Sequence, residues 1–264
     1  MVLNTIYSVL YTSYFLRTFA PMSATVKPYQ EQEGDKREQV ELMFNNISPK
    51  YDLLNRVLSL GIDKIWRKQA LNLLKKDNPT YILDVATGTA DLAIEAATRL
   101  KATTIVGIDI AENMLQIGRE KIAKKQLDNI ITLQKGDSEK INFEDNTFDA
   151  VIVSFGVRNF QHLEIGLSEI YRVLKPGGNI MVLEFSKPQK APFKQLYQFY
   201  FKNILPVVGK MVSKDTAAYT YLPDSVNAFP DGKAFCAILE KVGFSIQHFK
   251  PFTFGVCTSY VGKK

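Results

Sequence analysis

Two acidic residues, each at the end of a short apolar run, are the side chains whose spacing points most directly to chemistry. Asp84 lies in a run that begins at Ile82, and Asp109 follows the run Thr103–Ile108. A turn of small residues, Ala86–Thr89, separates the first run from a helical pattern. Two parallel strands joined by that helix would bring both acids and the turn to one edge of a sheet, where ligands bind in open α/β folds. Because a carboxylate can accept hydrogen bonds from both ribose hydroxyls, we expect an adenosine-containing cofactor.

The turn favours one kind of adenosine cofactor over another. The three glycine positions of the dinucleotide fingerprint hold Ala86, Gly88 and Asp91. An acid at a helix N-terminus would repel the pyrophosphate that such a terminus otherwise attracts. S-adenosylmethionine has no phosphate, and its positive charges favour nearby acids. The turn therefore favours S-adenosylmethionine, the alternative being a simple βα turn in a sugar- or phosphate-handling protein.

The composition suits one large α/β domain and excludes several classes of function. The chain has 264 residues, 46% of them hydrophobic, and a net charge of +6. Its lysines are scattered, without a basic run or an aromatic-interleaved basic box, so we expect no nucleic-acid partner. Two cysteines and two histidines at unsuitable spacing predict no metal site, and the few cysteines favour a reducing compartment.

The first twenty residues are apolar and aromatic, which raises the question of a signal peptide or a membrane anchor. No positive segment precedes this stretch, its charge at Arg17 comes late, and polar residues interrupt it. An ordinary polar start follows at Met22. We expect a start codon assigned too far upstream, with a true anchor as the alternative, and no contribution of residues 1–34 to the fold.

Alternating strand and helix patterns supply the elements that would position the turn and the acids. Strands are expected at about 80–86, 104–109, 130–135, 149–154 and 178–185, with helices at 90–100, 111–126 and 161–173. A helix at 231–241 and strands at 244–250 and 252–262 would complete the sheet. This alternation predicts a mostly parallel, doubly wound α/β sheet.

Two segments do not follow this alternation. Residues 35–76 form a predicted helical cap, with one helix over Lys36–Phe44 that Ile47-Ser-Pro ends and another over Asp63–Leu74. Residues 186–230 are aromatic and rich in proline, with an amphipathic stretch from Phe193 to Val212, and are expected to be an insertion. We therefore expect a single domain over residues 35–264.

Further motifs occur in a specific order. They are Met-Phe-Asn-Asn-Ile-Ser-Pro-Lys-Tyr-Asp at 43–52, Ser-Phe-Gly-Val-Arg-Asn at 154–159, Tyr-Arg-Val-Leu-Lys-Pro-Gly-Gly at 171–178 and Leu-Glu-Phe-Ser-Lys-Pro at 183–188. With the turn, these motifs resemble the ubiquinone/menaquinone biosynthesis C-methyltransferases over roughly residues 30–262. The resemblance implies a Rossmann-like class I S-adenosylmethionine-dependent methyltransferase, with a seven-stranded sheet whose last strand is antiparallel. The turn departs from the general methyltransferase pattern, since Gly88 alone remains of its glycines.

The resemblance also implies a set of cofactor-binding residues. They are Thr89 in the turn, Asp109 on the ribose, Asp137 and Ser138 near the adenine, and Ser154 after the fourth strand. Asp137 and Ser154 could instead cap a turn or a strand end. Asp84 would either face the methionine part of the cofactor or hold the turn.

The implied reaction is methyl transfer to a ring carbon of a reduced quinone, which becomes nucleophilic when a neighbouring hydroxyl loses its proton. Arg158 is the candidate for stabilising the phenolate, with a structural ion pair as the alternative. His162 is a weaker candidate for the base, as are Tyr219 and Tyr221. No catalytic base is assigned.

An isoprenoid quinol is the expected substrate, and the insertion is expected to hold its tail. The side chains for this groove are Phe193, Leu196, Tyr197, Tyr200, Leu205 and Val208, with an ordinary lid helix as the alternative. Lysines 202, 210 and 214 beside them would favour an anionic membrane surface, so we expect a cytoplasmic protein in peripheral contact with the inner face of the cytoplasmic membrane.

The residues from Met22 to Gln30 resemble bacterial menaquinone-pathway members, which favours methylation of demethylmenaquinol to menaquinol. The ubiquinone benzoquinol precursor, another lipid substrate, and a non-enzymatic assembly role in a quinone pathway remain alternatives.

Overall fold

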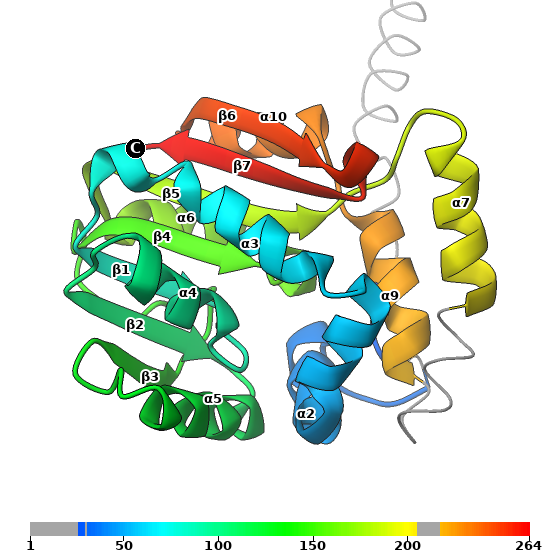
Figure 1. The fold of residues 1–264 in the computed structure, drawn as a ribbon, viewed down its shortest axis with the longest axis horizontal. Helices are drawn as coiled ribbons and strands as arrows, with labels where there is room; N and C mark the ends of the chain where they lie inside the picture. Colours follow the sequence, from blue (N-terminus) through cyan, green and yellow to red (C-terminus); the bar gives the residue numbers. More distant parts are fainter. Residues whose placement is uncertain (1–25, 30, 205–216) are drawn as a thin grey trace, which may run out of the picture.

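A central sheet with helices on both faces forms the body of the molecule (Figure 1). The computed structural model describes residues 26–29, 31–204 and 217–264. The sheet has seven strands in the order β3-β2-β1-β4-β5-β7-β6. They are β1 Tyr81–Val85, β2 Thr104–Asp109, β3 Ile131–Lys135, β4 Phe148–Ser154, β5 Leu174–Phe185, β6 Ser245–Phe252 and β7 Cys257–Lys263. Strand β7 is antiparallel to both neighbours and the remaining pairs are parallel, so the predicted fold class is confirmed.

Two apolar layers cover the sheet. On one face lie α3 (Ile62–Asn72), α4 (Asp91–Arg99) and α5 (Glu112–Lys124); on the other lie α6 (Leu163–Val173) and α10 (Lys233–Val242) (Figure 1). The central strands are buried on both faces, which explains their continuous apolar runs. Since β1 and β4 are adjacent, the loops that follow them meet at one edge of the sheet.

Helix α2 runs from Lys36 to Ser59 and passes through Pro49, so the prediction that a helix ends at Ile47-Ser-Pro is wrong. A proline inside a helix leaves the carbonyl four residues earlier without its usual donor. Here that carbonyl, on Asn45, accepts a hydrogen bond from Ser48 Oγ at 3.0 Å and another from Asn113 Nδ2 at 3.3 Å. Apolar residues on both sides of the proline are also buried, so packing offsets the lost hydrogen bond.

The segment before α2 also differs from expectation. Val26 and Tyr29 pack against the apolar cluster under α2, and the backbone N–H of Tyr29 donates to Gln39 Oε1 at 3.0 Å. The expectation that residues 1–34 take no part in the fold therefore does not hold for 26–29 and 31–34.

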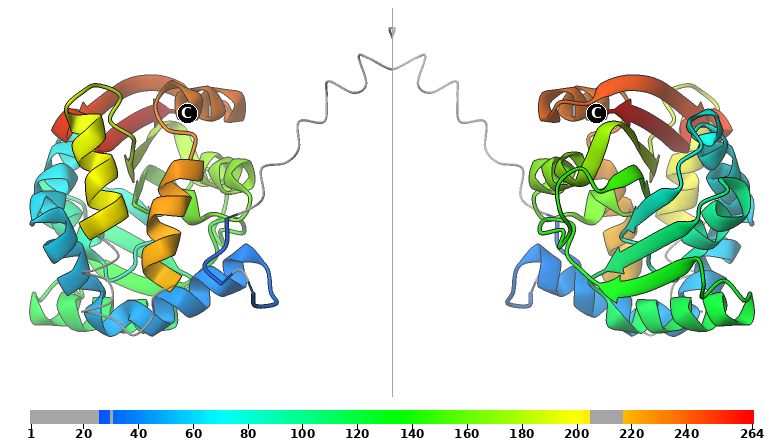
Figure 2. Two further views of the ribbon diagram at one scale, coloured as in Figure 1. Left: turned by 90° about the vertical axis from the view of Figure 1, so that its right-hand side faces the viewer. Right: turned by 90° about the vertical axis from the view of Figure 1, so that its left-hand side faces the viewer.

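The insertion contributes two helices that stand side by side next to α2. They are α7 (Phe193–Phe199), which continues as a π-helix to Ile204, and α9 (Ala217–Ala228) (Figure 2, left). Leu205, Val208, Lys210 and Lys214 lie outside the described residues.

Candidate active site

Both acids noted in the sequence hold the turn after β1. The backbone N–H of Gly88 donates to Asp109 Oδ2 at 2.8 Å, and Thr87 Oγ1 donates to Asp84 Oδ2 at 2.7 Å. Asp84 is fully buried and lines neither of the two cavities described below, so it holds the turn. Burial raises its pKa to about 7, because desolvation penalises the charged carboxylate.

A cavity of about 70 Å³ lies against this turn, at the carboxyl ends of β1, β2, β3 and β4. Asp109, Asp137, Ser138 and Ser154 all line it, together with Gly88. A Cβ added at Gly88 would meet no atom within 4 Å, so the space above the turn is open. The structure thus brings four of the five expected cofactor residues together.

Thr89 is the exception. Its hydroxyl donates to Asp52 Oδ1 at 2.6 Å and accepts from Lys121 Nζ at 3.0 Å. The residue is buried and does not line the cavity. Its side chain therefore connects the turn to α2 and α5.

Asp137 forms a turn cap and an ion pair at the edge of the small cavity. Its Oδ1 accepts from the backbone N–H of Glu139 at 2.9 Å, as a turn cap would, and its Oδ2 pairs with Arg37 of α2 at 2.9 Å. It nevertheless lines the small cavity.

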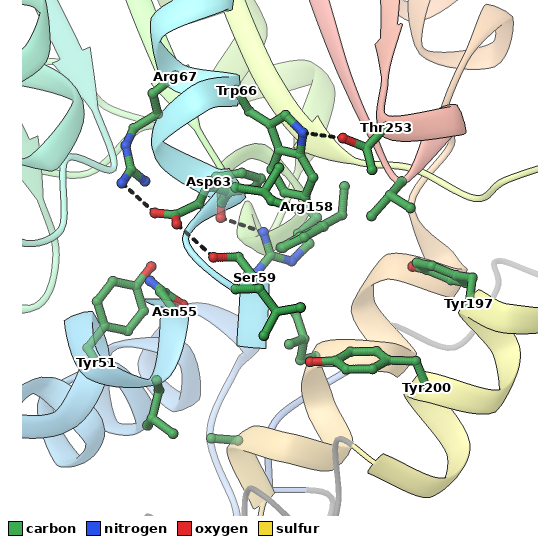
Figure 3. A pocket seen from close by; sticks show the side chains of 18 of the residues that line it. Tyr51, Asn55, Ser59, Asp63, Trp66, Arg67, Arg158, Tyr197, Tyr200 and Thr253 are labelled. Carbon is green, nitrogen blue, oxygen red and sulfur yellow. Dashed lines mark hydrogen bonds and ion pairs between the residues drawn. The ribbon is translucent and has the colours of Figure 1, made fainter. Parts of the chain in front are cut away.

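A second cavity, of about 430 Å³, adjoins the first (Figure 3). Its walls come from α2, α3, α7, α9 and the loop between β6 and β7, and they are mostly apolar and aromatic. Phe193, Leu196, Tyr197 and Tyr200 line it, as the sequence predicts. Phe44, Tyr51 and Phe155 line both cavities, so a ligand in one lies next to a ligand in the other.

The helical cap supplies much of this wall, which the sequence reasoning missed. Among the cap residues are Tyr51, Asn55, Ser59, Asp63, Trp66 and Arg67 (Figure 3). The motif over residues 43–52, which contains Tyr51 alone of these, indicated the family but not a place in the site, because the role of a cap residue depends on how the cap packs on the sheet.

Arg158 reaches the large cavity and also forms a buried ion pair. Its Nη1 donates to Glu184 Oε1 at 2.8 Å and to the carbonyl oxygen of Phe155 at 2.5 Å. Its Nε is buried and has no hydrogen-bond partner among the described residues. Burial raises the pKa of Glu184, an effect that the nearby guanidinium opposes. The structure is thus compatible with both interpretations of Arg158, a structural ion pair and stabilisation of the phenolate.

The weaker candidates for a base are placed differently. His162 Nδ1 lies 2.8 Å from Glu139 Oε2, and 54% of the histidine side chain is exposed. It lines neither cavity. Tyr221 lines the large cavity and donates to Asn159 Oδ1 at 3.1 Å, whereas the side chain of Tyr219 lies outside what the structure describes.

Comparison with known proteins agrees with this arrangement. The model of the ubiE/COQ5 methyltransferase family matches residues 31–264. The chain belongs to this family. It is 48% identical over 239 residues to a demethylmenaquinone methyltransferase of Bacteroides fragilis, covering 90% of this chain and 97% of that protein. It is 44% identical over 231 residues to a ubiquinone/menaquinone biosynthesis C-methyltransferase of Geobacter sulfurreducens, covering 87% and 90%.

Solved structures share the fold at lower identity. A SAM-dependent methyltransferase from Aquifex aeolicus is 19% identical, with a TM-score of 0.56 over 80% of this chain and 97% of that one. The [4+2]-cyclase SpnF is 15% identical, with a TM-score of 0.62 over 88% and 97%. As a member of the ubiE/COQ5 family, the protein is an S-adenosylmethionine-dependent C-methyltransferase.

Proposed function

We propose that the protein transfers a methyl group from S-adenosylmethionine to a ring carbon of demethylmenaquinol, giving menaquinol. The observation that carries this proposal is the contact between a small cavity, lined by four of the expected cofactor-binding residues, and a large apolar one through Phe44, Tyr51 and Phe155. A methyl donor in the first and a planar lipid quinol in the second would be adjacent. The relatives named as demethylmenaquinone methyltransferases, from Bacteroides fragilis and Porphyromonas gingivalis, support this substrate.

The residues around the small cavity suit the methyl donor. Asp109 offers carboxylate oxygens for ribose hydroxyls, while Asp137, Ser138 and Ser154 offer acceptors and donors for the adenine and the amino acid part. The open space above Gly88 admits a ligand close to the backbone. S-adenosylmethionine supplies an electrophilic methyl group when bound. The residues around it bind and orient, and orientation alone can contribute several kcal/mol to such a transfer.

The large cavity would hold the quinol ring and part of its tail. Trp66, Phe155 and Phe185 form an aromatic group in which neighbouring ring centroids lie 4.6–6.4 Å apart. Such faces suit a flat aromatic ring. The unpartnered Nε of Arg158 provides a donor and a positive charge for the phenolate that forms as the hydroxyl proton leaves.

Methylation of demethylmenaquinol by the purified enzyme tests this function. The expected product is menaquinol, detected by mass spectrometry after anaerobic incubation with S-adenosylmethionine. The demethylated benzoquinol precursor serves as the competing substrate, and faster turnover of it would move the protein to the ubiquinone pathway. Incorporation into neither quinol would refute the proposal.

A lipid substrate requires access from a membrane, and the entrance to the large cavity offers an apolar rim formed by Leu60, Leu196 and Phe254. These residues line the cavity yet are 84%, 59% and 68% exposed. Leu60 and Phe254 also have φ values of 52° and 57°, which cost energy for residues with a side chain. Exposed Lys190 and Lys194 lie beside this rim in α7 and its approach.

We infer that the apolar rim rests on the inner face of the cytoplasmic membrane. None of the helices in the described ranges is long and apolar enough to cross a bilayer. The predicted contribution of lysines 202, 210 and 214 stays a prediction, because their side chains lie outside the described part.

Vesicle sedimentation tests this contact. We expect binding to vesicles that contain phosphatidylglycerol, and a loss of about tenfold for each of Leu60→Ser and Phe254→Ser. Ile165→Ser, at an exposed position of α6 on the opposite face of the sheet, is the matched control and should bind as the wild type does. Equal binding of all variants to the vesicles would exclude the apolar rim as the membrane contact.

A further inference from the structure

One carboxylate stands in the mostly apolar wall of the large cavity. Asp63, in the first turn of α3, is the single Asp or Glu among the described residues that line this cavity. The residue is only 4% exposed. A buried carboxylate in an apolar wall is costly unless it is paired, so its retention needs a reason.

The partners of Asp63 orient its carboxyl group and leave acceptor capacity on both oxygens. Its Oδ1 accepts a hydrogen bond from Ser59 Oγ at 2.6 Å, and its Oδ2 accepts from Arg67 Nη2 at 2.5 Å (Figure 3). Each carboxylate oxygen has two lone pairs, so each can accept one more hydrogen bond. Both partners also line the cavity.

A chain of polar contacts fixes Asp63 relative to the cofactor turn. Arg67 Nη2 also donates to Asp91 Oδ2 at 3.1 Å, and Asp91 pairs with Lys121. Lys121 Nζ then donates to Thr89 Oγ1 at 3.0 Å. The carboxylate in the substrate cavity is therefore held by the same side chains that hold the turn beside the small cavity.

The other polar groups of the large cavity are poor proton acceptors. Burial raises the pKa of Tyr197 and of Tyr221, so both remain protonated at neutral pH. The Arg158 guanidinium also keeps its protons. His162, the histidine considered from the sequence, lines neither cavity.

We propose that Asp63 is the catalytic base, accepting the hydroxyl proton of the quinol next to the carbon that is methylated. This inference rests on the proposed function. The quinol O–H bond breaks and an O–H bond forms on Asp63, leaving a phenolate. The ring carbon then forms a bond to the methyl carbon as the carbon–sulfur bond breaks, and the sulfur keeps that electron pair. Solvent water accepts the proton from that ring carbon, which restores aromaticity, and Asp63 returns its proton to the oxygen. One proton is thus released to solvent overall.

Asp63→Asn tests the role without changing the size of the side chain. At pH 7 we expect kcat to fall by about 10²–10⁴-fold, the range for removal of a general base. The dissociation constant of S-adenosylhomocysteine, measured by calorimetry, should stay within about twofold, because the variant leaves the small cavity intact. Asp77→Asn, at an exposed position outside both cavities, is the matched control and should keep wild-type kcat.

The pH dependence separates a base from a merely structural residue. In Asp63→Asn the phenolate must form in solvent, so kcat should rise about tenfold per pH unit between pH 7 and 9 under anaerobic conditions. The wild type should rise far less. Asp63→Glu keeps a carboxylate and should recover part of the activity.

Three outcomes would overturn the proposal: kcat of Asp63→Asn within about threefold of wild type, a loss independent of pH, or no advantage of Glu over Asn. If the Asn variant does not fold, the comparison of Asp63→Glu with wild type over the same pH range decides the question. Wild-type turnover in the same assay distinguishes failure of this proposal from failure of the proposed function, since the latter would abolish wild-type turnover as well.

Discussion

The two cavities are built in opposite ways. The small cavity is made by loops at the ends of adjacent parallel strands, and its turn is fixed by Asp84 and Asp109. The large cavity is made by α2, α3, α7 and α9, which lie beside the sheet in segments far apart in the sequence. The small cavity thus lies against the ends of the sheet, whereas the large cavity is formed by helices that lie outside the alternating strands and helices of the sheet. The distant solved structures share the fold with this chain, and a shared fold does not by itself determine the substrate.

The largest expected effect comes from breaking the buried ion pair beside the large cavity. Arg158→Met leaves Glu184 buried and uncompensated, so the free energy of unfolding should fall by about 3–5 kcal/mol. Arg158→Met combined with Glu184→Leu removes both charges and should restore stability, as measured by urea denaturation. If Arg158 also stabilises the phenolate, the double variant stays inactive. Recovered activity would reduce Arg158 to a structural role.

The buried carboxyl group of Asp84, which holds the turn beside the small cavity, should make the free energy of unfolding depend on pH. Its folded pKa of about 7 lies above the unfolded value, so its stabilising contribution is complete below about pH 4 and is lost as the pH rises through 7. Between these limits the free energy of unfolding should fall by up to about 4 kcal/mol. Asp84→Asn should lack this fall, whereas identical curves for the two proteins would contradict the burial argument. Denaturant melts at each pH unit measure the difference.

Asp109→Ala should act on the small cavity alone. Loss of two hydrogen bonds from the ribose hydroxyls to a carboxylate would raise the dissociation constant of S-adenosylhomocysteine by about 100-fold. Calorimetry measures this change, and Asp77→Asn again serves as the control. The KM for the quinol should stay within about twofold. If the dissociation constant and the quinol KM rose by similar factors, the two cavities would not bind cofactor and quinol separately.

Trp66→Phe should act on the large cavity, with the smallest effect. Trp66 Nε1 donates to Thr253 Oγ1 at 2.8 Å and so connects α3 to the loop between β6 and β7. Losing this hydrogen bond should cost about 1 kcal/mol of stability and raise the quinol KM a few fold. Cofactor affinity should not change. A change in cofactor affinity without one in KM would reverse the assignment of the two cavities.

The two cavities also differ in how far the sequence predicts them. The family resemblance implied that Asp109, Asp137 and Ser154 lie together, and their places agree with this, because each ends or follows a strand and parallel strands bring their ends to one edge. Thr89 shows the limit of that reasoning. The sequence places it in the turn, but the direction of its hydroxyl depends on Asp52 and Lys121, which come from other elements.

The sequence predicted the wall of the large cavity only where several of its residues come from one helix. Phe193, Leu196 and Tyr197 share a helix, so their common direction follows from helical spacing. Asp63 gave no such signal, because a carboxylate in an amphipathic helix normally faces solvent. At Pro49 the predicted helix end was wrong. The donors that replace the missing N–H are the side chains of Ser48 and Asn113, and the sequence pattern does not reveal them.

Helix α2 covers both cavities, with Phe44 and Tyr51 facing each of them. A displacement of this helix on binding of either ligand would change both binding sites, and the two affinities would then be thermodynamically linked. By reciprocity, the factor by which bound cofactor changes the affinity for the quinol equals the factor by which bound quinol changes the affinity for the cofactor. Such a link would be heterotropic cooperativity between a water-soluble and a lipid-soluble ligand.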